Sequence, residues 1–372
     1  MKKVFWMRNN YNAVVCGLLL FGLCCWNLLT PSQALSVSER RRLAQLPELS
    51  WSAVLDASWM EGFDKYATDQ LAGRDTFRRI KLRVERGLLR KADSNGLFEV
   101  AGHLFKLESR LDRDSVASLC RKLMAVAGTF PEDSPIYVAM IPEKNAYLPA
   151  DDGHLVLDYA ALEELFLQGL PAEWNGFSLL DLLELDDYYR TDLHWRQERL
   201  QPVVARLLRT LGAVPDPSWA AMELHSHDPF YGAYYGQMAG LATPDTLCWL
   251  NNAVLEGATL TSAEHADELL PVYDERAFDG LDGYDLFLHG AQAVLTLRNP
   301  IGTTGRSLVL FRDSFGSALA PLLLQSYDSI TLVDLRYISP SLLGEYVSYE
   351  GADILFLYSA ALVNNSGAIR GF

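Results

Sequence analysis

The chain has 372 residues, of which 49% are hydrophobic and 21% charged, a composition typical of a globular protein that buries a core. Its net charge of −15 argues against a nucleic-acid partner, because phosphate backbones bind basic surfaces. The same charge disfavours an acidic polysaccharide unless the protein has a local basic groove. Only Cys120 and Cys248 lie outside the N-terminal region, so a disulfide framework is excluded; these two can form one bridge or remain free thiols.

The N-terminus carries the pattern of a targeting segment. Lys2, Lys3 and Arg8 precede an uncharged apolar stretch at 13–29. Its length is near the lower limit of about 17–25 residues for a membrane span. Residues 32–34 read SQA, which offers a small-x-small cleavage site. We predict that residues 1–34 are a signal peptide or a signal anchor. The remainder would then be extracytoplasmic, either secreted or held at the membrane by this segment.

Residues 35–94 are predicted to form a linker and a helical extension. Apolar residues recur at helical spacing from Trp59 to Leu89, and Gly73 interrupts the pattern, so we expect one or two helices there. The turn signal at 94–96 then introduces a hairpin with strands at 97–100 and 103–107. The main α/β domain is predicted to cover residues 95–372.

Strands and helices alternate through this domain. Apolar runs typical of buried parallel strands occupy 136–141, 294–297, 308–311, 329–333 and 354–357, with a shorter strand at 177–180. Helical spacing is found at 115–128, 159–167, 197–211 and 318–324. This alternation favours a doubly wound, mostly parallel sheet. The stretch from about 215 to 277 has no clear period and is predicted to be an irregular insertion over the site.

Ser314 is the first candidate catalytic residue. It follows the strand predicted at 308–311 and precedes a helical pattern. At the carboxyl end of a parallel strand, its hydroxyl would face the crevice where α/β proteins bind ligands, and the following amides can stabilise an oxyanion. The alternative is that Asp313 or Ser314 only caps the helix.

Asp192 and His194 are two residues apart, so in an extended backbone both side chains project from one face. A serine hydroxyl needs a neighbouring base to act as a nucleophile at neutral pH, and His194 can be that base. Asp192 would either orient the imidazole directly or approach the serine beside it, with backbone or water orienting the histidine.

A second constellation competes with this one. His225, His227 and Asp228 can present metal ligands from one face of an extended segment, although no further ligand is identifiable nearby. Surface or lid histidines are the alternative. No dinucleotide or P-loop motif is present. We therefore predict a site that uses neither a metal nor a cofactor.

Two blocks resemble a known family. Residues 188–195, YYRTDLHW, resemble the YYxTDHHW signature of the DHHW proteins, and 312–317, RDSFGS, resembles their later DSY block. Further segments match in order at 66–75, 95–105, 227–232, 287–292 and 333–337. DHHW proteins are similar to the SGNH-like O-acetyltransferases of alginate and other polysaccharides, in which the Asp-x-His block precedes the nucleophilic serine. The resemblance implies an SGNH-hydrolase-like (flavodoxin-like) α/β fold.

The resemblance also implies a function and a site. The function is acetyl transfer to a cell-surface polysaccharide through an acyl-enzyme, with acetyl received from a membrane-embedded acyltransferase partner. Ser314, His194 and Asp192 would form the catalytic triad. The residues predicted to bind the oxyanion or the substrate are Phe315, Gly290, Gln292, Arg312 and Tyr189; the alternative for Arg312 is local pairing with Asp313.

Three positions depart from the family pattern. Leu193 replaces the first histidine of the double-histidine motif, Phe315 replaces the usual tyrosine, and Ala291 replaces an asparagine that commonly supplies an oxyanion donor. Gly290 and Gln292 are candidates to replace that donor. These departures leave two alternatives open: a carbohydrate or cell-wall esterase of the same design, and a catalytically idle envelope scaffold or carbohydrate-binding protein.

Overall fold

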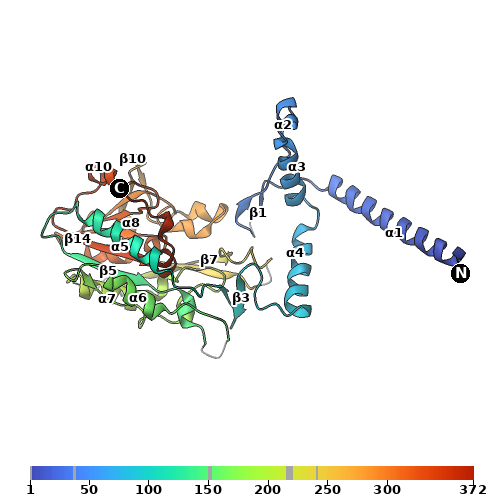
Figure 1. Cartoon of the computed structure of the whole chain (residues 1–372). Helices are drawn as coiled ribbons and strands as arrows, with labels where there is room; N and C mark the ends of the chain where they lie inside the picture. The colour runs from blue at the N-terminus through green and yellow to red at the C-terminus, as the bar shows by residue number, and fades with distance from the viewer. Residues whose placement is uncertain (1, 37–38, 150–152, 215–220, 240–241) are drawn as a thin grey trace. The chain divides into compact units, whose positions relative to one another are not determined.

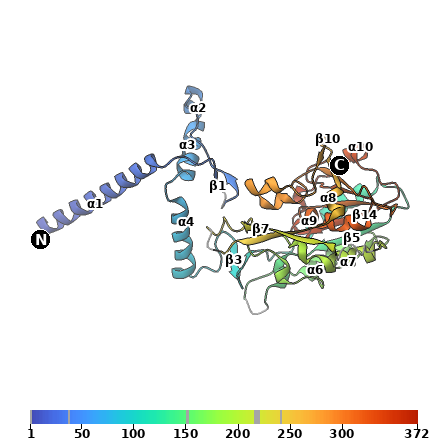
Figure 2. The same cartoon turned by 180° about the vertical axis from the view of Figure 1, so that it is seen from behind.

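The protein is described from a computed structural model that covers residues 2–36, 39–149, 153–214, 221–239 and 242–372. Two compact units make up the chain. The first consists of Met1–Ser94 and Gly236–Leu241, and the second of Asn95–Tyr235 and Ala242–Phe372. Figures 1 and 2 show the elements of both units from opposite sides.

The first unit begins with the long helix α1 (Lys2–Leu29), drawn in dark blue in Figure 1. Within it, Tyr11–Leu29 has a mean hydropathy of 1.9 and is long and apolar enough to cross a membrane. A signal sequence has the same properties, so the helix fits both predicted roles. At its end, the Asn27 side chain accepts a hydrogen bond from the Ala72 amide at 2.8 Å.

Short elements complete this unit: β1 (Leu35–Ser36), β2 (Arg41–Arg42), α2 (Trp51–Leu55), α3 (Ser58–Asp69), α4 (Arg74–Arg83) and the π-helical turn η1 (Val84–Leu88). The predicted break occurs at Gly73, whose φ of 71° lies in the left-handed region that glycine tolerates. A distant segment joins the unit through two arginines of α4. Arg78 donates to the Gly236 carbonyl at 2.6 Å, and Arg79 donates to the Ala239 carbonyl at 3.1 Å.

The second unit starts with the predicted hairpin, formed by β3 (Leu97–Val100) and β4 (His103–Lys106). Its centre is an eight-stranded sheet in the order β10-β9-β11-β13-β12-β14-β5-β6. The strands from β13 to β6 pair in parallel, and β11, β9 and β10 extend one edge in antiparallel pairing. The bounds are β5 Ile136–Ile141, β6 Asn175–Gly176, β9 Thr259–Ser262, β10 His265–Leu270, β11 Val294–Arg298, β12 Ser307–Arg312, β13 Ser329–Val333 and β14 Ala352–Ser359.

Alternate residues of the central strands supply two cores, one on each face of the sheet. In β14, Leu355 and Leu357 join the cluster that contains residues of α7 (Gln201–Thr210) and α9 (Phe315–Leu323). Ile354 and Phe356 join the opposite cluster, which contains residues of α5 (Arg113–Ala127), α6 (Tyr159–Gln168) and α11 (Ala360–Asn364). Helices therefore cover both faces, which confirms the predicted α/β class with a mostly parallel, doubly wound sheet.

Two predicted segments differ from the structure. Phe177–Leu180 is not a strand; the short strand is β6, two residues earlier, and the Phe177 amide only continues its pairing by donating to the Val138 carbonyl. The supposed irregular insertion contains the hairpin β7 (Glu223–Phe230) and β8 (Asp245–Asn251), then α8 (Ala253–Gly257), β9 and β10. Residues 215–220 and 240–241 of that stretch lie outside the described residues. A last short helix, α10 (Leu343–Tyr346), precedes β14.

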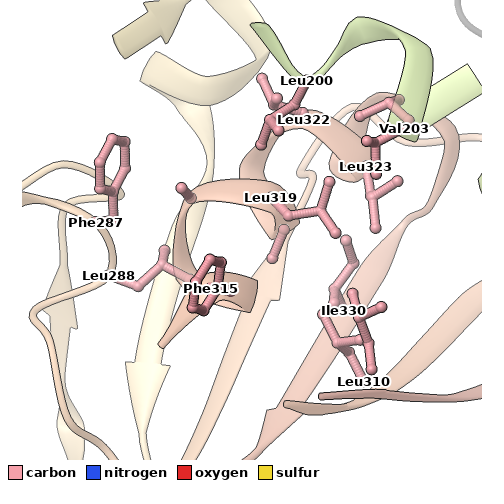
Figure 3. Packing of buried hydrophobic residues seen from close by; sticks show 14 of the residues in the cluster. Leu200, Val203, Phe287, Leu288, Leu310, Phe315, Leu319, Leu322, Leu323 and Ile330 are labelled. Carbon is pink, nitrogen blue, oxygen red and sulfur yellow. The ribbon is translucent and has the colours of Figure 1, made fainter. Parts of the chain in front are cut away.

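Helix α9 lies against the sheet through leucines (Figure 3). In this view Leu319 points toward Leu310 of β12 and Ile330 of β13, while Leu322 and Leu323 face Leu200 and Val203. All nine residues of α9 are buried, which is why its sequence, FGSALAPLL, has no polar face. The helix that follows Ser314 is therefore fixed by packing along its whole length.

This packing predicts how much stability the protein loses when a cavity is made beneath α9. Leu310 is 0% exposed, so Leu310→Ala should lower the free energy of unfolding by about 3 kcal/mol, through lost burial and incomplete collapse. Leu342→Ala is the control, because Leu342 is 44% exposed; it should change stability by less than about 0.5 kcal/mol. Urea unfolding monitored by tryptophan fluorescence measures both, and equal midpoints for the two variants would contradict the packing described.

Candidate active site

Ser314 stands between the end of β12 and the first residue of α9. Its backbone is helical, with φ −59° and ψ −24°, and its side chain makes no capping hydrogen bond. Instead, Ser314 Oγ lies 2.8 Å from His194 Nε2. Because β12 pairs in parallel with β13 and β14, the serine is at the carboxyl edge of the central strands, as predicted. The idea that Ser314 only caps the helix is therefore wrong.

Asp313 shapes this junction. Its Oδ1 atom accepts a hydrogen bond from the Phe315 amide at 3.1 Å, and its Oδ2 atom accepts one from the Ser359 amide at 2.8 Å. One carboxylate thus ties the start of α9 to the end of β14. Gly316 follows with no room for a side chain, since a Cβ there would lie 2.7 Å from the Arg312 Cβ. The serine backbone is held by neighbours on both sides.

Asp192 and His194 belong to a narrow loop closed by backbone hydrogen bonds. The Tyr189 amide donates to the His194 carbonyl at 3.1 Å, and Tyr188 forms an isolated bridge with Trp195. Asp192 Oδ1 accepts from the His194 amide at 3.0 Å and lies 2.7 Å from His194 Nδ1. Asp192 Oδ2 accepts from the Ala233 amide at 2.7 Å. The structure therefore has the first of the two predicted arrangements, in which the aspartate orients the imidazole directly.

The tip of this loop is held by Asp245, which begins β8. Its carboxylate accepts hydrogen bonds from the Arg190 amide at 2.8 Å, the Thr191 amide at 2.7 Å and the Thr191 hydroxyl at 2.6 Å. Gly232 packs so closely over the Thr191 carbonyl that a Cβ would overlap it. The segment that supplies the Ala233 amide is thus in direct contact with the loop that carries Asp192.

Lys144 donates hydrogen bonds to backbone carbonyls of the same loop. Its side chain is 2% exposed, and its ammonium donates to the carbonyls of Tyr189 at 3.1 Å, Arg190 at 3.2 Å and Asp192 at 2.7 Å. Burial lowers the pKa of Lys144 to about 7, against the nearby carboxylate charges, of which Asp192 is the largest. The Arg190 carbonyl also accepts from the Leu104 amide at 2.7 Å, so Lys144 adds to that bond and gives the Tyr189 and Asp192 carbonyls a charged donor.

Further contacts connect the loop to α9. The Trp195 indole donates to the Phe315 carbonyl at 3.1 Å, and the Gln197 side chain donates to the Ala318 carbonyl at 2.7 Å. The His194 ring stacks on Tyr284 with a centroid distance of 3.8 Å and an interplanar angle of 10°. Phe315 packs against the same imidazole at 4.8 Å. The base is therefore positioned by aromatic packing as well as by its two polar partners.

The predicted oxyanion donors are only partly placed for that role. The Phe315 amide already donates to Asp313, and the Gln292 side chain accepts from the Ser262 hydroxyl at 2.9 Å. Gly290 ends a run of three residues with positive φ, after Leu288 and His289, and its amide donates weakly to the Phe287 carbonyl at 3.4 Å. The Ser314 amide itself donates no hydrogen bond within the described part of the chain.

The predicted substrate contacts of Arg312 and Tyr189 are wrong, because both side chains are only 1% exposed. The Arg312 guanidinium faces inward, with Nη1 3.7 Å from Asp334 Oδ2 and 3.4 Å from the Asp313 carbonyl. Burial lowers its pKa below the ordinary value. The Tyr189 hydroxyl accepts from the Cys248 amide at 3.5 Å. Both residues stabilise the interior beneath the site.

The histidines of the competing constellation pack against aromatic rings. His225 stacks on Trp249, and His227 stacks on Phe278 at 3.8 Å, so the two imidazoles pack against different rings. Among the described residues, no group of three or more histidine, cysteine, aspartate or glutamate side chains is arranged to hold a metal. Cys120 and Cys248 are both buried free thiols.

Sequence reasoning missed Lys144, Asp245, Ala233 and Tyr284. The sequence contained a signal for Lys144, because two charged residues, Glu143 and Lys144, follow Pro142 at the end of a buried strand. No local pattern marks the other three, because each reaches the loop from a segment distant in the sequence. Their roles depend on tertiary contacts.

Solved structures share this fold. A DHHW family protein from Eubacterium siraeum DSM 15702 is similar over 74% of this chain and 94% of its own, with 19% identity and a TM-score of 0.62. Bacillus cereus PatB1 is similar over 72% of this chain and 96% of its own, with 17% identity and a TM-score of 0.57. PatB1 with a sulfonyl adduct matches at 15% identity, again with a TM-score of 0.57.

These likenesses confirm, at the level of the fold, the predicted similarity to DHHW proteins. No protein-family model matches the sequence, and no curated protein matches it.

Glu143, which precedes Lys144, should make the free energy of unfolding depend on pH. Its side chain accepts from the Ala361 amide at 3.1 Å, and burial, reinforced by the charges of Glu108 and Asp313, raises its pKa to about 8. Between pH 4.5 and 8 the folded protein therefore holds a proton that the unfolded chain releases, so stability falls as pH rises.

Glu143→Gln keeps the acceptor for the Ala361 amide and removes this titration. Relative to the variant, the wild type should lose about 2 kcal/mol of unfolding free energy from pH 6 to pH 8. Urea unfolding of both proteins at several pH values measures the difference. Parallel pH profiles would show that Glu143 does not carry the extra proton.

Proposed function

We propose that this protein is an extracytoplasmic, serine-dependent O-acyltransferase that transfers acetyl groups to a cell-surface polysaccharide. One observation carries the proposal: a continuous hydrogen-bond chain runs from Ser314 Oγ to His194 Nε2 at 2.8 Å and from His194 Nδ1 to Asp192 Oδ1 at 2.7 Å. A hydroxyl, a base and a buried carboxylate in this order are the parts of a covalent acyl-transfer site. The resemblance of both sequence blocks to DHHW proteins supports the choice of acetyl and glycan.

In the proposed first step, Ser314 Oγ attacks the carbonyl carbon of the acyl donor as its proton moves to His194 Nε2. The same proton then passes to the leaving group, and an acyl-serine remains. The Asp192 carboxylate is 0% exposed and accepts the hydrogen bond from His194 Nδ1–H. It therefore stabilises the imidazolium that exists after His194 takes the serine proton and before it passes that proton on. In the second step a sugar hydroxyl gives its proton to His194 as its oxygen attacks the acyl carbon; the bond from that carbon to Ser314 Oγ then breaks, and Oγ takes the proton from His194, which leaves the acylated sugar and the free serine.

The negative charge that develops on the carbonyl oxygen needs hydrogen-bond donors. The Ser314 amide is the first candidate, because it has no acceptor among the residues described. Gly290 is the second, in a turn whose unusual backbone is typical of functional sites. Gln292 is the third candidate: its side-chain carbonyl accepts from Ser262, and its side-chain NH2 is the group that would donate to the oxyanion.

The esterase alternative uses the same site and differs only in the acceptor. If water reaches the acyl-serine in place of a sugar hydroxyl, the product is the free acid. The alternative of a catalytically idle scaffold is motivated by three departures from the family pattern, at Leu193, Phe315 and Ala291. Phe315, however, argues against the idle-scaffold alternative. Its ring is 1% exposed and packs on Trp195 and His194, so the triad contacts form without a tyrosine hydroxyl at this position. The acetyl donor would come from a membrane-embedded acyltransferase partner.

The triad is tested with an activated acetyl ester and a sulfonyl fluoride, a reagent class suggested by the sulfonyl adduct of PatB1. Ser314→Ala and His194→Ala should each lower acetyl release by at least about a thousandfold, and Asp192→Asn by roughly a hundredfold or more. Mass spectrometry should find one acyl or sulfonyl group on Ser314 of the wild type.

Ser317→Ala is the matched control, because Ser317 is a buried serine in the first turn of α9 and its hydroxyl is outside the hydrogen-bond chain. It should retain wild-type rates and labelling. Labelling that persists in Ser314→Ala would show that Ser314 is not the nucleophile, and a wild type that neither reacts nor is labelled would favour the scaffold alternative. Adding oligosaccharide acceptors then separates acetyl transfer from hydrolysis.

The proposed location rests on α1. A flotation assay with lipid vesicles compares the full chain with a chain that begins at residue 35. Because Tyr11–Leu29 is apolar enough to span a membrane, the full chain should float with the vesicles and the shortened chain should remain in the aqueous fractions. Equal flotation of both would show that membrane contact does not depend on this helix.

A further inference from the structure

The loop that carries Asp192 forms part of the lining of a polar cavity of about 390 Å³. Arg190, Arg196 and Arg199 line it, together with His103 and Asp245. All belong to the second unit. Three arginines around one cavity are unexpected in a chain with a net charge of −15, because acidic proteins have many carboxylates available to pair with them.

Two of these arginines have no ionic partner among the described residues. In the part of the chain that the structure describes, no carboxylate lies within ion-pair distance of the Arg190 or Arg199 guanidinium, and both residues are exposed. Arg196 differs, since it pairs with Glu198 at 2.8 Å. The cavity therefore presents two free guanidinium groups, each with donors in the planar arrangement that suits carboxylate and phosphate oxygens.

His103 adds a third donor. It is 3% exposed, and its Nδ1 atom has no hydrogen-bond partner within the described residues. A neutral imidazole avoids a buried unpaired N–H by carrying its hydrogen on the other nitrogen. That nitrogen, Nε2, is 3.6 Å from Asp186 Oδ1, beyond hydrogen-bond distance. The Asp186 side chain is 80% exposed, so it is free to move away from the ring.

The acidic residues described at the cavity do not form ion pairs with Arg190 or Arg199. The Asp245 carboxylate is already surrounded by the Arg190 amide, the Thr191 amide and the Thr191 hydroxyl. Asp186 lies at the surface, and Glu198 is committed to Arg196. An incoming anion would therefore meet the free guanidinium groups of Arg190 and Arg199 and the Nε2–H of His103.

We propose that this cavity is a binding site for an oxyanionic group, either a phosphate or a carboxylate. Arg190 and Arg199 would donate to its oxygens from two sides, and His103 Nε2 from the interior. The proposal is independent of the acyltransferase activity. It does connect the two sites, because Arg190 is in the loop held by Asp245 and Lys144, which also carries Asp192.

Isothermal titration calorimetry of the full chain in detergent tests the proposal. Inorganic phosphate and glucuronate are the two anionic probes, and glucose is the uncharged control. Saturable binding of either anion, without binding of glucose, is the expected result. Phosphate alone would identify a phosphate-type ligand, and glucuronate alone would identify a sugar carboxylate.

Arg190→Gln and Arg199→Gln should each weaken binding by roughly tenfold or more, the loss expected for a charge-assisted hydrogen bond. Arg209→Gln is the matched control, an exposed arginine of α7 outside the cavity, and should bind as the wild type does. Thermal melting verifies that each variant is folded, and Arg199→Glu provides a second variant at the exposed position. No saturable binding, or equal affinity in wild type and arginine variants, would overturn the proposal.

Discussion

The buried carboxylate of Asp192 is the constraint on which the candidate site depends. A fully buried charge is tolerated only when its oxygens are hydrogen-bonded, and three donors meet this requirement: the His194 amide, the His194 ring and the Ala233 amide. Each donor fixes a different part of the structure. Together they determine the shape of the loop, the orientation of the base and the position of the segment after β7.

The second requirement is that this loop meets Ser314, which is 120 residues beyond His194 in the sequence. Hydrogen bonds from Trp195 and Gln197 to carbonyls of α9 provide that connection. Helix α9 is itself buried along its length and is held at its start by Asp313. The loop and the helix are thus attached to the same rigid sheet. These contacts position His194 and Ser314 relative to each other.

The sequence was informative where a pattern was local. Long apolar runs predicted the central strands, and the Asp-x-His and Asp-Ser blocks predicted which side chains would meet. Strands of the supposed insertion were missed because β9 has only four residues, and because β7 has the sequence ELHSHDPF, in which Ser, Asp and Pro disfavour a strand and most positions are not buried. Arg312 and Tyr189 were misassigned for a related reason. A charged or hydroxylated side chain looks accessible in a sequence, whereas its burial depends on distant partners such as Asp334 and Cys248.

The segment from Gly236 to Leu241 has a consequence for how the protein is made. It belongs to the N-terminal unit, where Gly236 and Ala239 accept hydrogen bonds from Arg78 and Arg79, yet the chain on both sides of it belongs to the other unit. During synthesis the N-terminal unit therefore cannot be completed when its first 94 residues emerge. It must wait for about 140 further residues, by which time much of the second unit has already left the ribosome. The two units are interleaved in the chain, so neither can be excised by a single cut.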